Sequence, residues 1–555
     1  MAYDDVIQYI GENRRFQWKS YFLLCLPVMC CAFHEMGGKF LSAKADFRCS
    51  LPTENVENAT FLPSSDAMNI AHQLRLDVET LPQCEKYDFD FSDIHNTSSL
   101  RSSEMNATEP CASFVYDKSQ YTNTATTEWN LVCDRAWMRV LSDSLFMGVS
   151  VVGGLVIGRS SDRYGRKVTF IVALIIQLVS GILVAVSPEI ISYTIFRCIV
   201  GATASGVFLV SYVMALEMVG PADRMAAGTG CQFFYSSGYL LMSGLAYGIR
   251  DWRILQMAFT IPSVAFLGYW WCIPESIRWL LSRGRQKEAE VLLQKTLLRK
   301  GTKSFDNTLE HLLNQENEAM QKDIESSSMF DLLKYPNLRR KVLLLSIGWF
   351  VNNLAYYGLS WSTSDLGGDD YVNCAFSALV EMPAEAFAYF TVNRWGRKIV
   401  LCGSMLVFGT ALLLTPCVPD DMPWMVTVLA MFGKMTITTS YVTVSIFAAE
   451  QLPTQIRNLA MAVCSTAGNL GGVVAPYIND LGGVWTPLPL IIFGSCSLCA
   501  SLSMLFLPET LKQKLPESIR EGENFGRNMG IEADGEPMMR LNLASNCVQV
   551  TQSTE

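Results

Sequence analysis

The chain has 555 residues, of which 50% are hydrophobic and only 17% are charged. This composition excludes a disordered chain, a collagen-like chain and a small disulfide-stabilised scaffold. The net charge is −9, from 43 basic and 52 acidic residues, which is not expected of a protein that binds nucleic acid. Because long stretches carry almost no charge, the sequence predicts a protein that crosses the lipid bilayer many times.

Twelve apolar segments come close to the length of about 20 residues that a helix needs to cross the hydrocarbon core. A cleavable signal peptide is not expected, because Met1–Lys19 is polar and the first apolar segment is too long. The predicted spans are 21–41, 138–158, 168–187, 190–213, 228–249, 253–273, 341–361, 371–392, 399–416, 423–447, 459–479 and 486–507.

The segment 43–137, between the first two spans, is acidic, with 15 Asp or Glu against 7 Lys or Arg. It contains the three glycosylation sequons of the chain, at Asn58, Asn96 and Asn106, which predict an extracellular loop. Four cysteines in the same segment predict two disulfides, with all three pairings left open. These are Cys49, Cys84, Cys111 and Cys133.

The short loops on the opposite side are basic. Arg159, Arg163 and Arg166 lie between the second and third spans, and Arg394 and Arg397 lie between the eighth and ninth. By the positive-inside rule these loops face the cytoplasm, together with the segment 274–340 and both termini.

The chain is internally duplicated. Asp162-Arg-Tyr-Gly-Arg-Lys167 recurs as Asn393-Arg-Trp-Gly-Arg-Lys398, and Pro274-Glu275 recurs as Pro508-Glu509. The number of residues between a motif and its copy is nearly the same for both motifs. This predicts two six-helix halves in parallel, related by an axis along the membrane normal, with a cavity between them. The predicted order is an N-terminal tail (1–20), a first half (21–273), a linker (274–340), a second half (341–507) and a C-terminal tail (508–555).

Several motifs resemble those of a known family. Gly158-x-x-x-Asp162-Arg163-x-Gly165-Arg166-Lys167 resembles the loop signature of the major facilitator superfamily. Three further stretches resemble the solute carrier 22 branch of this superfamily: 127–133, 274–280 and 507–515. Two short stretches resemble insect organic cation transporter-like members of that branch: 3–6 and 217–221. The resemblance implies an all-α fold of twelve transmembrane helices in two halves, with a large extracellular loop after the first helix, in the plasma membrane.

The sequence contains no Gly-x4-Gly-Lys-[Ser/Thr] phosphate loop and no Gly-x-Ser-x-Gly nucleophile motif. The four histidines lie on separate segments without the spacing of metal ligands. We therefore predict a transporter and not an enzyme, without cofactor or metal, driven by an electrochemical gradient or a coupled ion.

A cytoplasmic gate is predicted from charges that recur at the inner ends of both halves. Gly165 suits a tight turn, and Asp162 is expected to pair with a cation on a neighbouring helix. The alternative is that these charges only anchor the chain by the positive-inside rule. Asn393 replaces the acid in the second copy, which predicts a weaker lock there. The predicted gate residues are Asp162, Arg163, Gly165, Arg166, Glu217, Arg224, Arg278, Arg394, Arg397, Glu450 and Arg457.

Ionisable residues within spans cost about 2.5–3.5 kcal/mol each at mid-bilayer depth, so each requires a functional or structural reason. Glu35, Arg197 and Lys434 are such residues, and Glu381 and Glu385 share one helical face. Two carboxylates on that face favour a cavity for cations. The alternative is a purely structural role for either carboxylate, in which Glu385 pairs with Lys434 or Arg197.

Aromatic side chains favour organic ammonium groups through their ring faces, although packing and an interfacial belt are alternative roles. By resemblance, the residues that line the cavity of organic cation transporters are matched here by Phe208, Gln232, Tyr235, Trp349, Tyr356 and Glu381. Asn469 departs from the family pattern, since cation-transporting relatives have Asp there and anion-transporting relatives Arg.

The sequence predicts secondary transport of small organic ions by alternating access, with organic cations or zwitterions of many kinds as the preferred substrates. The first alternative is an organic anion exchanger. The more remote alternative is a membrane receptor or adhesion protein that uses the segment 43–137. The sequence leaves the physiological substrate, the coupled ion and the oligomeric state open.

Overall fold

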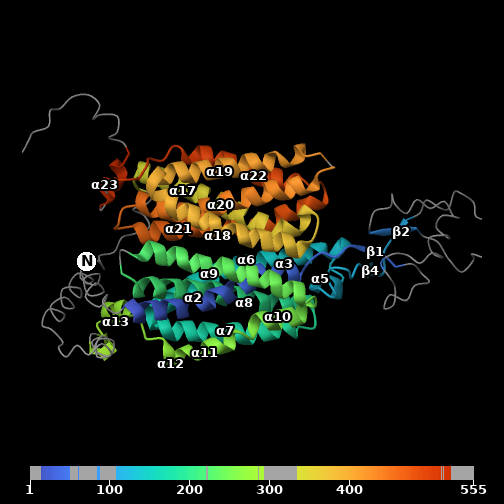
Figure 1. Ribbon diagram of the computed structural model, residues 1–555, viewed down its shortest axis with the longest axis horizontal. Coiled ribbons are helices and arrows are strands. Elements are labelled where there is room, and N and C mark those ends of the chain that lie inside the picture. The colour runs from blue at the N-terminus through green and yellow to red at the C-terminus, as the bar shows by residue number, and fades with distance from the viewer. Residues whose placement is uncertain are drawn as a thin grey trace, which may run out of the picture.

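The computed structural model describes residues 14–50, 61, 84–87, 108–220, 223–285, 287–289, 291–292, 334–419, 421–513, 515–516 and 518–526. Nine helical segments in this part of the chain are long and apolar enough to cross a membrane. Three further helices, α9, α18 and α22, run alongside them (Figure 1). The helix α18 carries four charged residues, Asp370, Glu381, Glu385 and Arg394.

The first half consists of six antiparallel segments. They are α2 (Arg14–Met36) with α3 (Gly38–Leu41), α6 (Ala136–Tyr164), α7 (Arg166–Ala185), α8 (Ile190–Met218), α9 (Arg224–Gly248), and the sequence α10 (Trp252–Thr260), α11 (Ser263–Leu267) and α12 (Tyr269–Cys272), followed by the short α13 (Ile277–Ser282). The first span therefore begins before the predicted residue 21. The predicted span 253–273 is broken after Thr260, where Pro262 has no N–H for a helical hydrogen bond.

The second half repeats this order. It contains α17 (Pro336–Trp361), α18 (Asp370–Trp395), α19 (Arg397–Leu413), α20 (Pro423–Gln451), α21 (Arg457–Asp480) and α22 (Leu488–Met504), followed by the short α23 (Ile519–Asn524). The carboxylate of Glu523 accepts hydrogen bonds from the backbone N–H groups of Asn337 and Leu338, at 3.0 and 2.9 Å. This contact seats α23 on the first turn of α17, a favourable place for a negative charge.

The two halves lie side by side and pack mainly through α6 against α21 and α9 against α18 (Figure 1). One end of the bundle carries the long loop 42–135, and we call it the loop end. The opposite end carries the tight turns at Gly165 and Gly396, together with α13 and α23, and we call it the turn end.

The described part of the long loop contains two small antiparallel sheets and a short helix. The strand β1 (Phe47–Cys49) pairs with β4 (Phe114–Tyr116), β2 (Glu85–Tyr87) pairs with β3 (Thr108–Pro110), and α5 (Ala125–Glu128) follows. Disulfides join Cys49 to Cys111 and Cys84 to Cys133, which selects one of the three possible pairings. The three predicted glycosylation sites lie outside the described residues.

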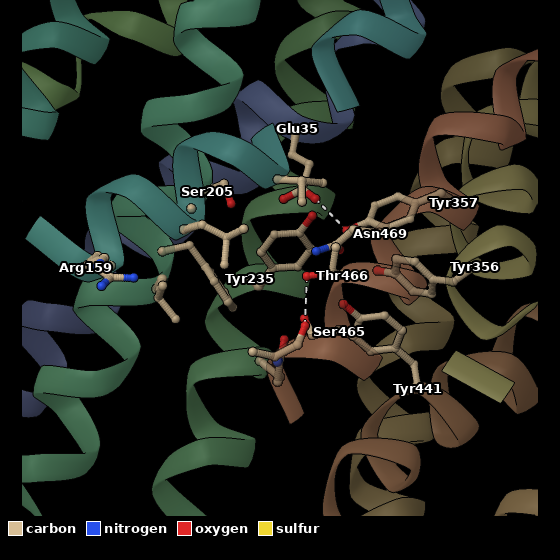
Figure 2. A pocket seen from close by; sticks show the side chains of 18 of the residues that line it. Glu35, Arg159, Ser205, Tyr235, Tyr356, Tyr357, Tyr441, Ser465, Thr466 and Asn469 are labelled. Atoms are coloured by element: carbon tan, nitrogen blue, oxygen red, sulfur yellow. Dashed lines mark hydrogen bonds between the residues drawn. The ribbon is translucent and has the colours of Figure 1, made fainter. Parts of the chain in front are cut away.

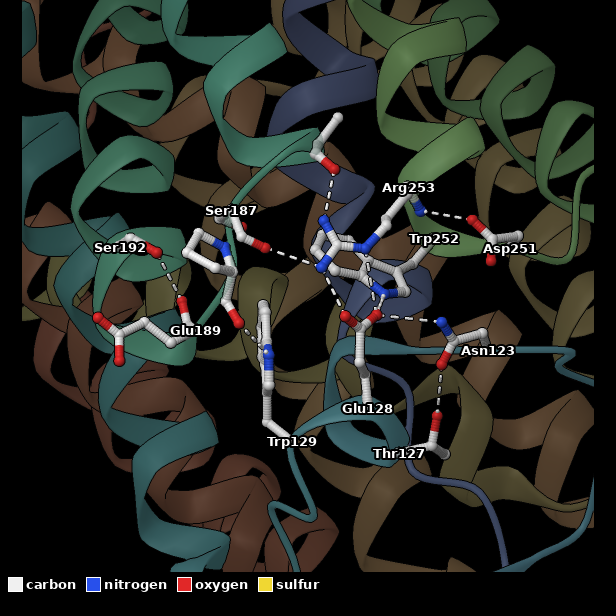
Figure 3. A network of polar contacts seen from close by, with 12 residues as sticks. Asn123, Thr127, Glu128, Trp129, Ser187, Glu189, Ser192, Asp251, Trp252 and Arg253 are labelled. Atoms are coloured by element: carbon white, nitrogen blue, oxygen red, sulfur yellow. Dashed lines mark hydrogen bonds and ion pairs between the residues drawn. The ribbon is translucent and has the colours of Figure 1, made fainter. Parts of the chain in front are cut away.

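The motif at residues 127–133 seats this loop on the first half (Figure 3). Glu128 accepts hydrogen bonds from Arg253 at 2.5 Å and from the indole N–H of Trp252 at 2.8 Å, and Trp129 donates to the carbonyl of Pro188. Burial acts to raise the pKa of Glu128, but the hydrogen bonds from Arg253, Trp252 and Asn123 outweigh it and hold that pKa below its ordinary value.

Candidate functional site

A cavity of about 1120 Å³ lies between the two halves, lined by residues of both (Figure 2). Its lining runs from Glu35 and Tyr357 in the middle of the bundle to Arg159, Asp162 and Arg283 at the turn end. The cavity therefore reaches the turn end, and this volume is large enough for a small organic molecule.

The inner wall of the cavity carries a carboxylate on α2. Glu35 accepts a hydrogen bond of 2.7 Å from the hydroxyl of Tyr357, which lies on α17 in the second half. The phenol of Tyr235, on α9, lies beside the same carboxylate (Figure 2). This contact joins the two halves within the cavity wall.

A second carboxylate, Glu381, forms an ion pair with Lys434 of α20, with Nζ and Oε1 2.8 Å apart. Both side chains are 1% exposed, and Glu381 also accepts a hydrogen bond of 2.9 Å from Tyr356. The same Nζ donates to the hydroxyl of Ser360 and lies 3.5 Å from the ring centroid of Tyr356. The buried charges thus satisfy each other, as ionic groups in a bilayer require.

The third carboxylate, Glu385, lies one turn further along α18 and lines the cavity. Its Oε1 atom accepts a hydrogen bond of 2.8 Å from Ser236 of α9, whose hydroxyl oxygen also lies 3.2 Å from Oε2 of Glu381. The predicted structural pair with Lys434 therefore involves Glu381 and not Glu385. Arg197 lies elsewhere, with its guanidinium over the rings of Phe146 and Tyr193.

Five of the seven predicted substrate-binding residues line the cavity: Phe208, Gln232, Tyr235, Tyr356 and Asn469. Two are not among the lining residues of this conformation. Glu381 is held by Lys434, and Trp349 is buried where Gly468 brings α21 against α17. Asn469 lies 3.4 Å from the amide of Asn353, which donates to it.

The list of predicted binding residues left out several that line the cavity: Glu35, Tyr357, Glu385, Thr438, Tyr441, Ser465 and Thr466. Tyr441 stacks on Tyr356 with their ring centroids 4.9 Å apart. Glu35 and Glu385 could be singled out in the sequence because each is a charged residue within an apolar span. The sequence does not show which tyrosines and hydroxyl residues face the cavity, because the packing of the helices decides that.

At the turn end of the first half, charged side chains connect successive helices. The guanidinium of Arg166 lies 2.7 Å from Asp162 and 3.4 Å from Glu217. The turn between α6 and α7 has Gly165 at a φ of 115°, and a Cβ there would lie 2.7 Å from Glu275. Glu275 accepts a hydrogen bond from the backbone N–H of Lys167, so a carboxylate caps the start of α7.

The second half repeats this arrangement. Arg397 lies 3.0 Å from Glu450, Gly396 has a φ of 105°, and Glu509 accepts hydrogen bonds from the backbone N–H groups of Arg397 and Lys398. Asn393, which replaces the acid of the first copy, lies 3.4 Å from the sulfur of Met225 in the first half. These ion pairs join helices within one half, and they are formed while the cavity reaches this end.

The other predicted gate residues lie at the same level. Arg163 lines the mouth of the cavity, and the guanidinium of Arg457 donates to the carbonyl of Leu452. Arg224 begins α9, Arg278 lies in α13, and Arg394 is at the end of α18. The structure thus places the predicted set at one end of the bundle.

The loop end is closed by polar contacts between the halves. The hydroxyl of Tyr121 donates to Asp370 at 2.6 Å, and the ammonium of Lys39 donates to the carbonyl of Ser360 at 3.1 Å. Arg139 forms an ion pair of 3.2 Å with Asp480. A cavity that is closed at one end and reaches the other is the geometry of a carrier with one side open.

Solved structures with this arrangement are membrane transporters. The proton:xylose symporter XylE of the major facilitator superfamily, bound to 6-bromo-6-deoxy-D-glucose, matches with a TM-score of 0.58 at 18% identity, over 92% of this chain and 99% of that chain. A partially occluded inward-open conformation of XylE from E. coli matches with a TM-score of 0.57 at 15% identity, over 89% and 99%. The fold is therefore that of the major facilitator superfamily, which confirms the predicted fold class.

Residues 102–520 match the family described as sugar (and other) transporter. The chain is 48% identical to the organic cation transporter protein of Drosophila melanogaster, over 95% of both chains, and 44% identical to an organic cation transporter-like protein of the same species, over 95% and 93%. It is 34% identical to mouse solute carrier family 22 member 2, over 94% and 96%. The chain belongs to the solute carrier 22 family and is a multi-pass secondary transporter, not an enzyme.

Proposed function

We propose that this transporter carries small organic cations or zwitterions across the plasma membrane by alternating access. The observation that carries the proposal is the cavity between the halves, which is walled by phenol rings and by the carboxylates of Glu35 and Glu385. Carboxylates and ring faces attract ammonium groups and do not demand one substrate shape. The names of the relatives at 44–48% identity support the same class of substrate.

The turn end is proposed to face the cytoplasm and the loop end the outside of the cell. The basic short loops of the turn end and the disulfides of the long loop support this orientation. The structure then corresponds to an inward-facing state. Both termini would be cytoplasmic, and the sequons at Asn58, Asn96 and Asn106 would be available for glycosylation.

The charged clusters of the turn end are proposed to take part in gating by fixing the helix ends within each half. Arg166 joins the ends of α6, α7 and α8 through Asp162 and Glu217. Arg397 joins the ends of α19 and α20 through Glu450. Such units can meet and separate as the halves rock about the central cavity. Asn393 leaves the second cluster with one acid fewer than the first.

The proposal is tested by uptake into oocytes that express the full chain. The panel contains radiolabelled tetraethylammonium as a cation, p-aminohippurate as an anion and carnitine as a zwitterion. Uptake of the cation or the zwitterion above that of water-injected oocytes is expected. Uptake of the anion alone would replace the proposal with organic anion exchange, and surface expression with no flux of any probe would contradict it.

A further inference from the structure

The two carboxylates that line the cavity, Glu35 and Glu385, differ in their partners from Glu381, which does not line it. Glu381 has its own cation, Lys434, at 2.8 Å. Glu35 and Glu385 both line the cavity, and among the described residues neither has a cation within 4.0 Å. The cavity therefore holds two acidic side chains that have no cationic side chain beside them.

Glu35 is already oriented toward the cavity. Its Oε1 atom is held by the hydroxyl of Tyr357, and the rings of Tyr235 and Tyr357 stand on either side of it (Figure 2). A hydrogen bond of this kind fixes the position of the carboxyl group. A cation beside Glu35 would contact both the charge and the ring faces, a combination that suits an organic ammonium group.

Glu385 gives independent evidence that this site binds a ligand. Its side chain belongs to a residue that is 3% exposed, and its Oε2 atom is buried with no hydrogen-bond partner among the described residues. Ser236 has one hydroxyl proton, so it cannot serve Glu381 and Glu385 at once. A buried acceptor without a donor is unfavourable, and an N–H group entering the cavity would satisfy it.

The two acids come from opposite halves of the protein and line the same cavity. Glu35 lies on α2 and Glu385 on α18. Tyr235 of α9 lies beside Glu35, and the next residue, Ser236, donates a hydrogen bond to Glu385. A ligand held between them touches both halves. Such a ligand has a different affinity for each arrangement of the halves, which is what couples binding to conformational change.

We propose that Glu35 and Glu385 form the ammonium-binding subsite of this transporter, and that it takes a protonated primary or secondary amine. This inference rests on the proposed function. An amine with N–H groups donates to the free oxygen of Glu385 while its charge lies beside Glu35, whereas a quaternary ammonium group leaves that oxygen unpaired. A site built to accept a hydrogen bond discriminates against a ligand that lacks the donor. Glu381 remains occupied by Lys434.

The test compares Glu35→Gln, Glu385→Gln and Glu381→Gln in oocytes that express the full chain, with surface amounts measured for each. The probes are radiolabelled phenylethylamine, a primary amine, and tetraethylammonium, a quaternary ion. Glu35→Gln is expected to raise KM for phenylethylamine about tenfold, which corresponds to about 1.4 kcal/mol. Glu385→Gln is expected to raise KM for phenylethylamine more than KM for tetraethylammonium. Glu189→Gln, an exposed acid at the start of α8, is the matched control.

If Glu35→Gln does not reach the surface, Glu35→Asp is measured instead and should also raise KM. As a second measurement, phenylethylamine should raise the Tm of the purified wild-type protein, and this shift should be lost in Glu385→Gln. Wild-type KM values in both Glu35→Gln and Glu385→Gln, with cation uptake intact, would overturn the subsite and leave the proposed function standing. No uptake of either cation by the wild-type protein would count against the proposed function itself.

Discussion

The two ends of the bundle hold their helices together in different ways. At the loop end, contacts of Tyr121, Lys39 and Arg139 cross from the first half to the second, as between Tyr121 and Asp370. At the turn end the ion pairs join helices of the same half, as between Arg397 and Glu450. Opening the loop end therefore requires contacts between halves to break, whereas each half can keep its turn-end contacts during the movement.

The contacts between the halves continue from the loop end to the middle of the bundle. Ser243 lies 2.8 Å from the sulfur of Cys374, and Ser236 donates to the carboxylate of Glu385 on α18. The ion pair of Glu381 with Lys434 lies at the level where these contacts give way to the cavity. This difference predicts unequal effects for substitutions at the two ends and in the middle.

The largest effect is expected for Glu381→Gln in the middle. It leaves Lys434 buried without a counter-charge, which should lower the free energy of unfolding by about 3–5 kcal/mol. The double variant with Lys434→Gln removes both charges and should lose less stability than the single variant. Thermal unfolding of the purified proteins in detergent measures both, and a wild-type Tm in the single variant would contradict the pairing.

The next effect is expected at the turn end, from Gly396→Ala. The φ of 105° is unsuited to a side chain, and a Cβ would lie 2.6 Å from the carboxylate of Glu509. A loss of about 1–3 kcal/mol in stability is expected from the strained backbone. Gly403→Ala, within α19 and with open space around its Cα, is the control and should show no loss. Equal Tm values for the two variants would show that the turn bears no strain.

A smaller, directional effect is expected at the loop end. Tyr121→Phe removes the hydrogen bond to Asp370 between the halves, which should favour opening of the loop end by about 0.5–1.5 kcal/mol. Cys374 is buried at the contact between the halves, so its rate of labelling by a thiol reagent should rise, as measured by mass spectrometry of its peptide. Tyr116→Phe, whose hydroxyl bonds to Asn130 within the loop, is the control and should leave this rate unchanged.

The smallest effect is expected for Lys44→Gln at the same end. Lys44 lies 3.7 Å from Asp480, and these side chains are 50% and 41% exposed. Exposed ion pairs contribute about 0–1 kcal/mol, and Arg139 continues to pair with Asp480 in the variant. The labelling rate of Cys374 should therefore stay near the wild-type value, and a rise as large as that of Tyr121→Phe would remove the distinction between buried and exposed contacts.

Much of this protein can be deduced from its sequence. The apolar spans, the repeat of Asp162–Lys167 as Asn393–Lys398 and the acidic long loop carry the fold class, because helix length and charge placement in a bilayer follow from local composition. The duplicated glycines also have a local cause, since both turns between successive spans need a positive φ.

The cavity could be predicted only in part. The sequence placed Glu381 and Glu385 on one face of a helix, but it could not tell which of them meets Lys434. That choice depends on the rotation of α18 relative to α20 and α9, which come from distant parts of the chain. For the same reason Glu35 was recognised as a charge that needs a partner, while its partner Tyr357 was not predicted.

The sequence by itself determined how many helices cross the bilayer, how they divide into halves and which residues gather at the turn end, because those features depend on segments of about 20 residues read one at a time. Only the tertiary structure decided which acids face the cavity, which cysteines pair in the loop and which end is closed. Each of these depends on distances between segments far apart in the chain, and local hydropathy and helical periodicity carry no information about such distances.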